Sequence, residues 1–185
     1  MSTGLAILMG IALSAAVGFR VFVPLLVMSI AANLGLIHFG AGFEWLGSYV
    51  ALITFAVATV VEIIGYYIPW FDNILDIIAT PLSLIAGAVV MASFVTDIDP
   101  VLRWVLIIVA GAGTAGLVQG ATVTTRAVST GSTGGLANPV LATAELLGSA
   151  ILAILTIFLP VLAIILALII IIYLGARLGR KFRQV

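Results

Sequence analysis

The stretch TGLAILMGIALSAAVGFRVFVPLL, residues 3–26, places one arginine and one proline inside an otherwise apolar run rich in small residues. The apolar pattern continues to about Leu36, and an α-helix needs about 20 such residues to cross a bilayer. Proline removes a backbone hydrogen bond and kinks a helix. We therefore expect a first membrane span that is broken or bent around Gly18, Arg20 and Pro24.

The composition is that of an integral membrane protein. Of the 185 residues, 64% are hydrophobic and 8% are charged, whereas charged residues make up about 25% of a globular chain. Backbone groups in lipid must be satisfied within their own segment, and the apolar runs lack the two-residue alternation of a barrel strand. We expect an all-α polytopic transmembrane bundle that forms a single domain over residues 1–185. Its expected spans, about six, are 3–36, 47–68, 74–95, 101–125, 140–158 and 160–175.

Two segments of the second half stand out by their small residues. The fourth expected span contains Gly111 and Gly113 and a GxxxG pattern at Gly116 and Gly120. This pattern allows helices to approach closely, either within the chain or in a homo-oligomer, and we favour a dimer. The following stretch, TTRAVSTGSTGGLANP (124–139), is polar and glycine-rich, which predicts a loop, either exposed or re-entrant.

The two halves of the chain, about 1–96 and 101–175, share a weak internal repeat. Alignment of Arg20 with Arg126 places small-residue helices on each other, and EIIGYYI at Glu62 matches ELLGSAI at Glu145. Three spans in each half predict a 3+3 inverted repeat, a fold that places its site near the bilayer midplane between the halves. The expected hinges are Gly18, Pro24, Pro81, Pro139 and Pro160.

Four ionisable residues lie inside or at the edge of the apolar runs: Arg20, Glu62, Arg126 and Glu145. An ion in hydrocarbon costs roughly 3–17 kcal/mol, so such residues normally face a bundle interior and mark a pathway or a partner. Glu62 is too deep in its expected helix to reach the headgroups, and we expect it either to pair with an arginine across the repeat or to carry a proton. The alternative to a coupling carboxylate is a structural ion pair that fixes helix register.

Polar residues near Arg126 extend this candidate solute or ion site: Ser129, Thr130, Ser132, Thr133 and Asn138. A guanidinium is a planar donor suited to carboxylate or phosphate, and a glycine-rich segment can hold an anion with its backbone N–H groups. The segment lacks the lysine of a phosphate-binding GxxxxGK[ST] loop. A flexible loop beside an arginine that reaches the interface is the alternative interpretation.

Asp72, Asn73 and Asp76 form a possible gate or cation site, because the two carboxylates lie one turn apart on one helical face. Carboxylates that complement a helix dipole are the plainer explanation. The chain has one histidine, His38, and no cysteine. We therefore expect no metal site and no cofactor, and no enzyme motif is present.

The C-terminal tail, residues 176–185, holds four of the seven basic residues: Arg177, Arg180, Lys181 and Arg183. Positive charge next to a span favours the cytoplasmic side, so we expect a cytoplasmic C-terminus. Such charges are ordinary topology signals, and membrane lipid, not nucleic acid, is the expected partner.

With GFRVFVPLL (18–26), the 62–90 stretch and RAVSTGSTGGLANPVLATAELLGS (126–149) in view, the chain resembles the bacterial domain-of-unknown-function 4126 family of small membrane proteins. The likeness is clearest at 17–27, 59–90 and 119–149. It implies a protein of the bacterial inner membrane and carries no activity or substrate.

Three functions are compatible with these patterns. The first is a channel or secondary transporter for a small anionic solute or ion, with protons available for coupling through the carboxylates. The second is a non-transporting accessory or scaffold subunit of a membrane complex, which also tolerates buried ion pairs. The third is an enzyme or flippase that acts on lipid. A transporter needs polar groups that converge on a water-accessible cavity, whereas a scaffold needs every buried charge paired.

Overall fold

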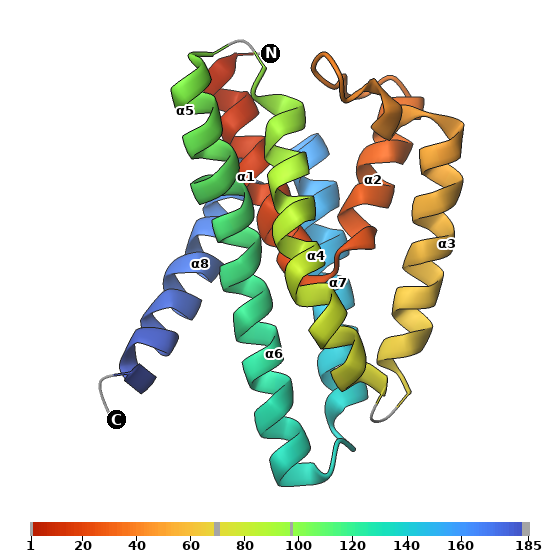
Figure 1. The fold of residues 1–185 in the computed structure, drawn as a ribbon, viewed down its shortest axis with the longest axis vertical. Helices are drawn as coiled ribbons and strands as arrows, with labels where there is room; N and C mark the ends of the chain where they lie inside the picture. Colours follow the sequence, from red (N-terminus) through yellow and green to blue (C-terminus); the bar gives the residue numbers. More distant parts are fainter. Residues whose placement is uncertain (1, 69–70, 97, 183–185) are drawn as a thin grey trace.

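The computed structural model describes residues 2–68, 71–96 and 98–182, without the side chains of residue 175 and residues 177–182. Over these residues the chain is helical, as expected (Figure 1). The elements are α1 (Thr3–Phe19), α2 (Phe22–Asn33), the short helix η1 (Glu44–Gly47), α3 (Tyr49–Tyr66), α4 (Phe71–Phe94), α5 (Pro100–Val105), the π-helical η2 (Leu106–Ala112), α6 (Gly113–Thr133), α7 (Asn138–Phe158) and α8 (Pro160–Phe182).

Four helices in the described part of the chain are long and apolar enough to cross a membrane: α3, α4, the continuous helix Pro100–Thr133, and α7. Three further apolar helices are shorter, namely α1, α2 and the Pro160–Leu174 part of α8. The described residues thus belong to a helical membrane protein with four helices of spanning length, which confirms the expected all-α fold and only part of the expected six spans. The basic side chains of the tail lie outside the described residues.

The break between α1 and α2 falls where the sequence places it, and proline explains its position. Arg20 has extended backbone angles, φ −147° and ψ 126°, and α2 begins two residues later. In an unbroken helix the ring of Pro24 would clash with the carbonyl group four residues earlier, which is that of Arg20. Within the first turn of a new helix the same proline is tolerated, because an N–H there has no partner in its own helix.

The break reverses the direction of the chain. Thr3 at the start of α1, His38 and Gly40 after α2, and Ile98 after α4 line one cavity. The N–H of Gly40 also donates to the carbonyl oxygen of Ser93 near the end of α4. We call this end of the bundle the N-terminal side. Helices α1 and α2 therefore form a re-entrant hairpin that enters and leaves on the N-terminal side (Figure 1). The expectation that they form one bent span is wrong.

The predicted inverted repeat is not supported. Thr3 and Ile98, close to the starts of the two halves, line the same cavity, so both halves begin on the N-terminal side. The second half also has no break beside its arginine, because α6 continues through Arg126 to Thr133. The expectation of a loop over 124–139 is wrong for 124–133. The helix ends at Gly134, whose φ of 63° is a left-handed conformation that glycine adopts without strain.

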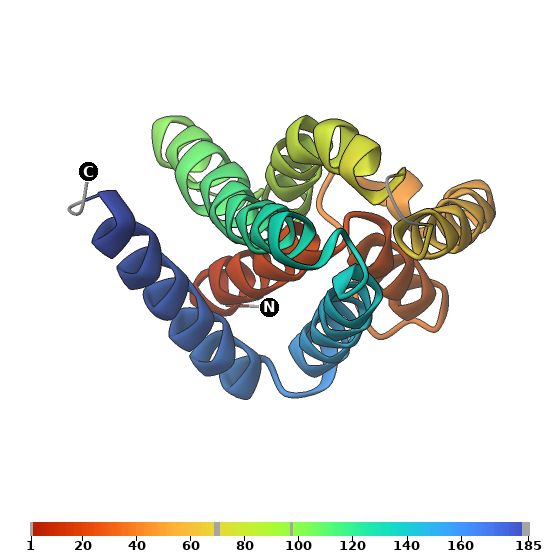
Figure 2. The same cartoon turned by 90° about the horizontal axis from the view of Figure 1, so that it is seen from below.

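Helix α1 is the centre of the bundle, in contact with α4, α6, α7 and α8 (Figure 2). A Cβ added to Gly18 would lie 2.5 Å from the carbonyl oxygen of Ala115 and 2.6 Å from Cβ of Val118. Gly18 is therefore a point of close approach to α6 rather than a hinge. Of the GxxxG pair, Gly116 packs against Leu84 of α4, whereas Gly120 has no neighbour within 4 Å.

The three other prolines that were expected as hinges differ in their position within a helix. Pro81 lies inside α4, Pro139 lies in the first turn of α7, and Pro160 is the first residue of α8. Proline at a helix start costs little because the missing N–H has no helical partner there.

We predict that Gly18→Ala destabilises the protein by about 1–3 kcal/mol, the usual cost of overpacking a filled site. The matched control is Gly120→Ala, also inside a helix, which has open space around it and gains helix propensity. Thermal melting of both variants in detergent micelles makes the comparison. Equal melting temperatures would contradict the close approach of α1 and α6.

Candidate functional site at the tip of the hairpin

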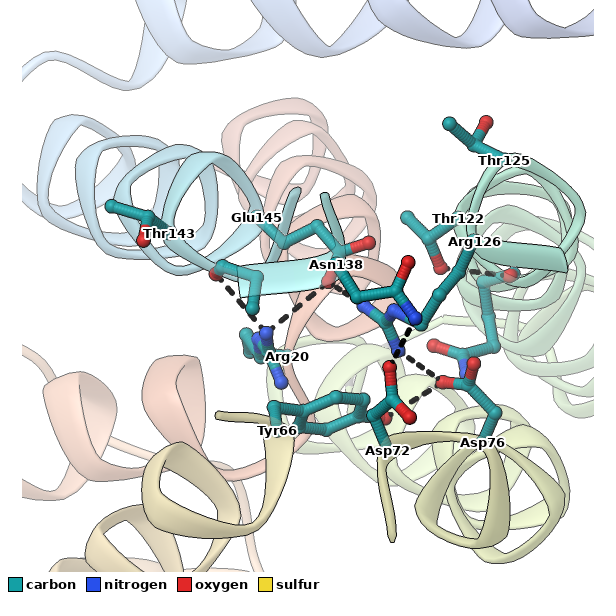
Figure 3. Close-up of polar contacts among 12 residues, drawn as sticks. Arg20, Tyr66, Asp72, Asp76, Thr122, Thr125, Arg126, Asn138, Thr143 and Glu145 are labelled. Atoms are coloured by element: carbon teal, nitrogen blue, oxygen red, sulfur yellow. Dashed lines mark hydrogen bonds and ion pairs between the residues drawn. The ribbon is translucent and has the colours of Figure 1, made fainter. Parts of the chain in front are cut away.

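Charged side chains gather where the α1–α2 hairpin ends inside the bundle (Figure 3). They come from the α1–α2 break, the end of α3, the start of α4, and the facing parts of α6 and α7. We call this group the hairpin-tip cluster. Its members, all buried, are Arg20, Glu62, Tyr66, Asp76, Arg126 and Glu145.

Glu145 joins the two arginines of the cluster. Its Oε2 atom lies 3.2 Å from Nη2 of Arg20 and makes a second ion pair with Nη2 of Arg126. Arg20 also donates through Nη2 to the carbonyl oxygen of Ala142, one turn earlier on α7, at 3.0 Å. One carboxylate therefore links the hairpin tip, α6 and α7.

Tyr66 and Asp76 bring α3 and α4 into the same network. Oδ1 of Asp76 lies 2.5 Å from Nη1 of Arg126 and accepts a hydrogen bond from the Tyr66 hydroxyl at 3.0 Å. The guanidinium carbons of Arg20 and Arg126 lie 3.6 and 4.4 Å from the centre of the Tyr66 ring. These distances are within the range of about 6 Å over which an aromatic ring attracts a cation.

Glu62 caps the start of α2. Its Oε1 atom accepts the backbone N–H of Val21 at 2.9 Å, and its Oε2 atom accepts that of Phe22 at 3.1 Å. The first N–H groups of a helix have no partner within the helix and carry partial positive charge, so a carboxylate stabilises them. In the described residues this cap takes the place of the expected ion pair with an arginine of the second half.

A second polar layer lies between the cluster and the end of the bundle where the α3–α4 and α6–α7 turns meet. We call this end the opposite side. The Asn138 amide donates to Oδ2 of Asp72 at 2.5 Å and to Oγ1 of Thr130 at 2.9 Å. The hydroxyl groups of Tyr67 and Thr143 are 2.7 Å apart and connect α3 to α7.

The two carboxylates of the proposed cation site, Asp72 and Asp76, bind different residues. Asp76 contacts Arg126 and Tyr66, whereas Asp72 accepts from Asn138 and from the backbone N–H of Asn73. No group of three or more potential metal ligands occurs among the described residues. The two carboxylates therefore act on different neighbours despite their shared helical face.

The expected anion-holding loop after Arg126 is helical instead. The hydroxyl groups of Ser132 and Thr133 donate to the carbonyl oxygens of Val128 and Ser129 in the same helix. Both residues are exposed, and only Thr130 of this segment joins the polar layer through Asn138. Side chains on the buried face of α6, not a loop, thus face the site.

Several buried donors of the site have no partner among the described residues. They are Nε and Nη1 of Arg20 and Nε of Arg126. Arg20 and Arg126 are only 2% and 1% exposed, so bulk water does not satisfy these groups. A buried donor without a partner costs about 1–3 kcal/mol, and more when it is charged. The carboxylates of the cluster, by contrast, all accept hydrogen bonds.

Two cavities flank the cluster. An apolar groove of about 510 Å³ between α3 and α4 reaches Glu62 and Tyr66. A pocket of about 180 Å³ between α6 and α7 is lined by Glu145, Thr122 and Thr125. Neither cavity is lined by Arg20 or Arg126, although each reaches carboxylates or the tyrosine of the cluster.

The structure thus brings Arg20, Glu62, Arg126, Glu145 and Asp76 together, as the sequence suggested for the first four. Sequence reasoning missed Tyr66. A signal for Tyr66 was present, because it lies four residues after Glu62 on the same helical face.

Comparison with known proteins gives a family match over most of the chain. A family model described as a domain of unknown function, DUF4126, matches residues 7–180, which agrees with the resemblance noted in the sequence. No curated protein and no solved structure matches the chain.

We predict that Arg126→Gln destabilises the protein by roughly 3–5 kcal/mol, because it leaves buried Asp76 without its cation and Glu145 with Arg20 alone. Arg103→Gln is the matched control, since Arg103 makes no ion pair among the described residues. Thermal melting in detergent measures the difference. A melting temperature equal to that of the control would contradict the network described above.

Proposed function

The chain belongs to the DUF4126 family, whose description assigns no activity, and we propose that it transports a small anionic solute or ion across a membrane with protons as the coupling ion. The observation that carries the proposal is the set of unpartnered guanidinium N–H groups of Arg20 and Arg126 at the hairpin tip. Ionisable groups at this depth are costly and normally serve a pathway. Discontinuous helices that end at such groups are typical of solute sites in transporters.

The polar groups that lack a hydrogen-bond partner support an anionic solute. In the hairpin-tip cluster the unpartnered atoms are N–H donors on arginines, and a guanidinium binds oxyanions through two parallel hydrogen bonds. The excess of carboxylates over arginines in the cluster supports proton coupling. The cluster has three carboxylates, Glu62, Asp76 and Glu145, for two arginines, so an added anion is repelled until one carboxylate takes up a proton.

For localisation we propose the cytoplasmic membrane of a bacterium, with the C-terminus in the cytoplasm. The basic residues of the tail support this orientation. Acidic Glu44 and Asp99 lie in connections on the N-terminal side, which then faces outward. The Asp72–Asn138 layer would face the cytoplasm and form the inner entrance to the hairpin-tip cluster.

The test is flux through purified protein reconstituted into liposomes that contain a pH-sensitive dye. We predict anion-dependent proton movement under a nitrate or formate gradient. Arg20→Gln and Glu62→Gln should reduce it to the level of empty liposomes, because the first removes a donor fork and the second uncaps α2 at the hairpin tip. Glu44→Gln, in an exposed connection, is the control. Unchanged flux in both cluster variants, with wild-type melting, would remove the proposal.

A scaffold subunit is the second candidate, and a different observation favours it. Both arginines pair with carboxylates and no described cavity reaches them, while α3 and α8 expose large apolar side chains that a partner helix can cover. Buried ion networks can be replaced by apolar residues of similar size with little loss of stability. A transporter therefore requires the charged side chains for flux, whereas a scaffold tolerates apolar residues in their place.

We predict that the quadruple variant Arg20→Met, Asp76→Leu, Arg126→Met, Glu145→Leu, which replaces both arginines together with their carboxylate partners, folds and loses flux. Its melting temperature and its flux, measured on one preparation, separate the two candidates. A variant that folds and still moves nitrate or formate like the wild type would show that the charges serve structure alone.

A further inference from the structure

Glu145 holds the position that an anion would take between the two arginines. Its Oε2 atom contacts Nη2 of both Arg20 and Arg126, while Nε and Nη1 of Arg20 and Nε of Arg126 remain without partners. A single carboxylate oxygen thus serves two guanidinium groups that offer further donors. A free anion that binds here competes with this carboxylate for the same N–H groups.

Space next to Glu145 allows its side chain to leave. The pocket of about 180 Å³ beside it is lined by Thr122 and Thr125 of α6 and otherwise by apolar side chains of α1, α7 and α8 and by alanines. The Thr122 and Thr125 hydroxyl groups donate to backbone carbonyl oxygens, which leaves their oxygen lone pairs to accept a hydrogen bond. A protonated carboxylic acid has an O–H to donate, whereas a carboxylate has none.

We propose that a small carboxylate anion binds between Arg20 and Arg126 in place of the Glu145 side chain, which takes up one proton and turns toward Thr122 and Thr125. The inference rests on the proposed transport function and names its substrate class. The anion brings one negative charge as Glu145 loses one, so the net charge of the cluster is unchanged. The ligand class follows from the group that it replaces. That group is the Glu145 carboxylate, so the ligand is a small carboxylate too.

No other charged or titratable group described around Glu145 both bridges the two arginines and borders the threonine pocket. Glu145 is faced from α4 by Asp76, from α6 by Arg126, and from the hairpin break by Arg20, while Tyr66 and Glu62 of α3 face Arg20. Described α8 contributes Leu174, which is apolar. Glu62 is held by two backbone N–H groups, and Asp76 is held by Arg126 and Tyr66. Glu145 is the carboxylate that bridges both arginines and also borders the threonine pocket.

The first test is chemical rescue of Glu145→Ala by formate, the smallest carboxylate. The variant loses the bridge between the arginines, and formate supplied in solution should restore it, because a ligand that binds only the folded state stabilises it. We expect a saturable rise in the melting temperature of Glu145→Ala with formate that is larger than the rise of Glu44→Ala at the same concentrations and ionic strength, because in Glu44→Ala the anion must first displace the Glu145 carboxylate. The absence of a rise above that control overturns the proposal.

The second test is the pH dependence of formate binding, measured by calorimetry on the detergent-solubilised protein. Binding to the wild type takes up one proton, so affinity should rise about tenfold for each unit by which pH falls while Glu145 is ionised in the free protein. In Glu145→Gln the affinity should not depend on pH over the same range. A wild-type affinity that does not change with pH, or a Gln variant that keeps the wild-type dependence, overturns the proposal.

The two tests separate this inference from the transport function on which it rests. Formate rescue of Glu145→Ala in a protein that moves no anion in liposomes would leave the anion subsite standing and remove transport. Anion flux in the wild type without formate rescue would leave transport standing and remove the subsite. Both readouts use the full-length chain.

Discussion

A helix that breaks within the hydrocarbon of a bilayer must find partners for its free backbone groups inside the protein, because lipid offers no hydrogen bonds. The α1–α2 hairpin creates this demand at Arg20 and Val21. Glu62 satisfies the N–H groups at the start of α2, and Glu145 satisfies part of the Arg20 side chain. Asp76 and Tyr66 then complete the surroundings of Arg126. The polar centre of the bundle thus follows from one broken helix.

The hydrogen-bonding groups of this polar centre are satisfied unevenly. Its carboxylates accept backbone or side-chain donors, while its guanidinium groups keep unpartnered N–H groups at exposures of 1–2%. A network that served stability alone would be expected to pair its donors, since a half-satisfied buried network costs more than an apolar core. An unpaired donor at the tip of a hairpin is, however, what a site for an exchangeable anion requires. This imbalance connects the fold to the proposed function.

The sequence indicated part of this arrangement. Pro24 located the break at Arg20, and isolated charges in apolar runs identified most of the cluster, because burial of an ion in lipid demands a partner. The reversal at Val21 could not be read from hydropathy, which reports length and polarity but not direction. It depends on Glu62, which lies 41 residues away from Val21. The helix through 124–133 was missed because its composition is that of a loop, whereas Arg126 on its buried face ties it to α4 and α7.

The re-entrant hairpin is tested most directly by labelling from one side of the membrane. The chain has no native cysteine, so single cysteines introduced at Ser2, Leu36 and Leu136 can be labelled one at a time with a membrane-impermeant thiol reagent on vesicles of known orientation. Positions 2 and 36 should react from the same side, and position 136 from the other. Labelling of positions 2 and 36 from opposite sides would mean that α1 and α2 cross as one span, and the hairpin tip with its site would not exist.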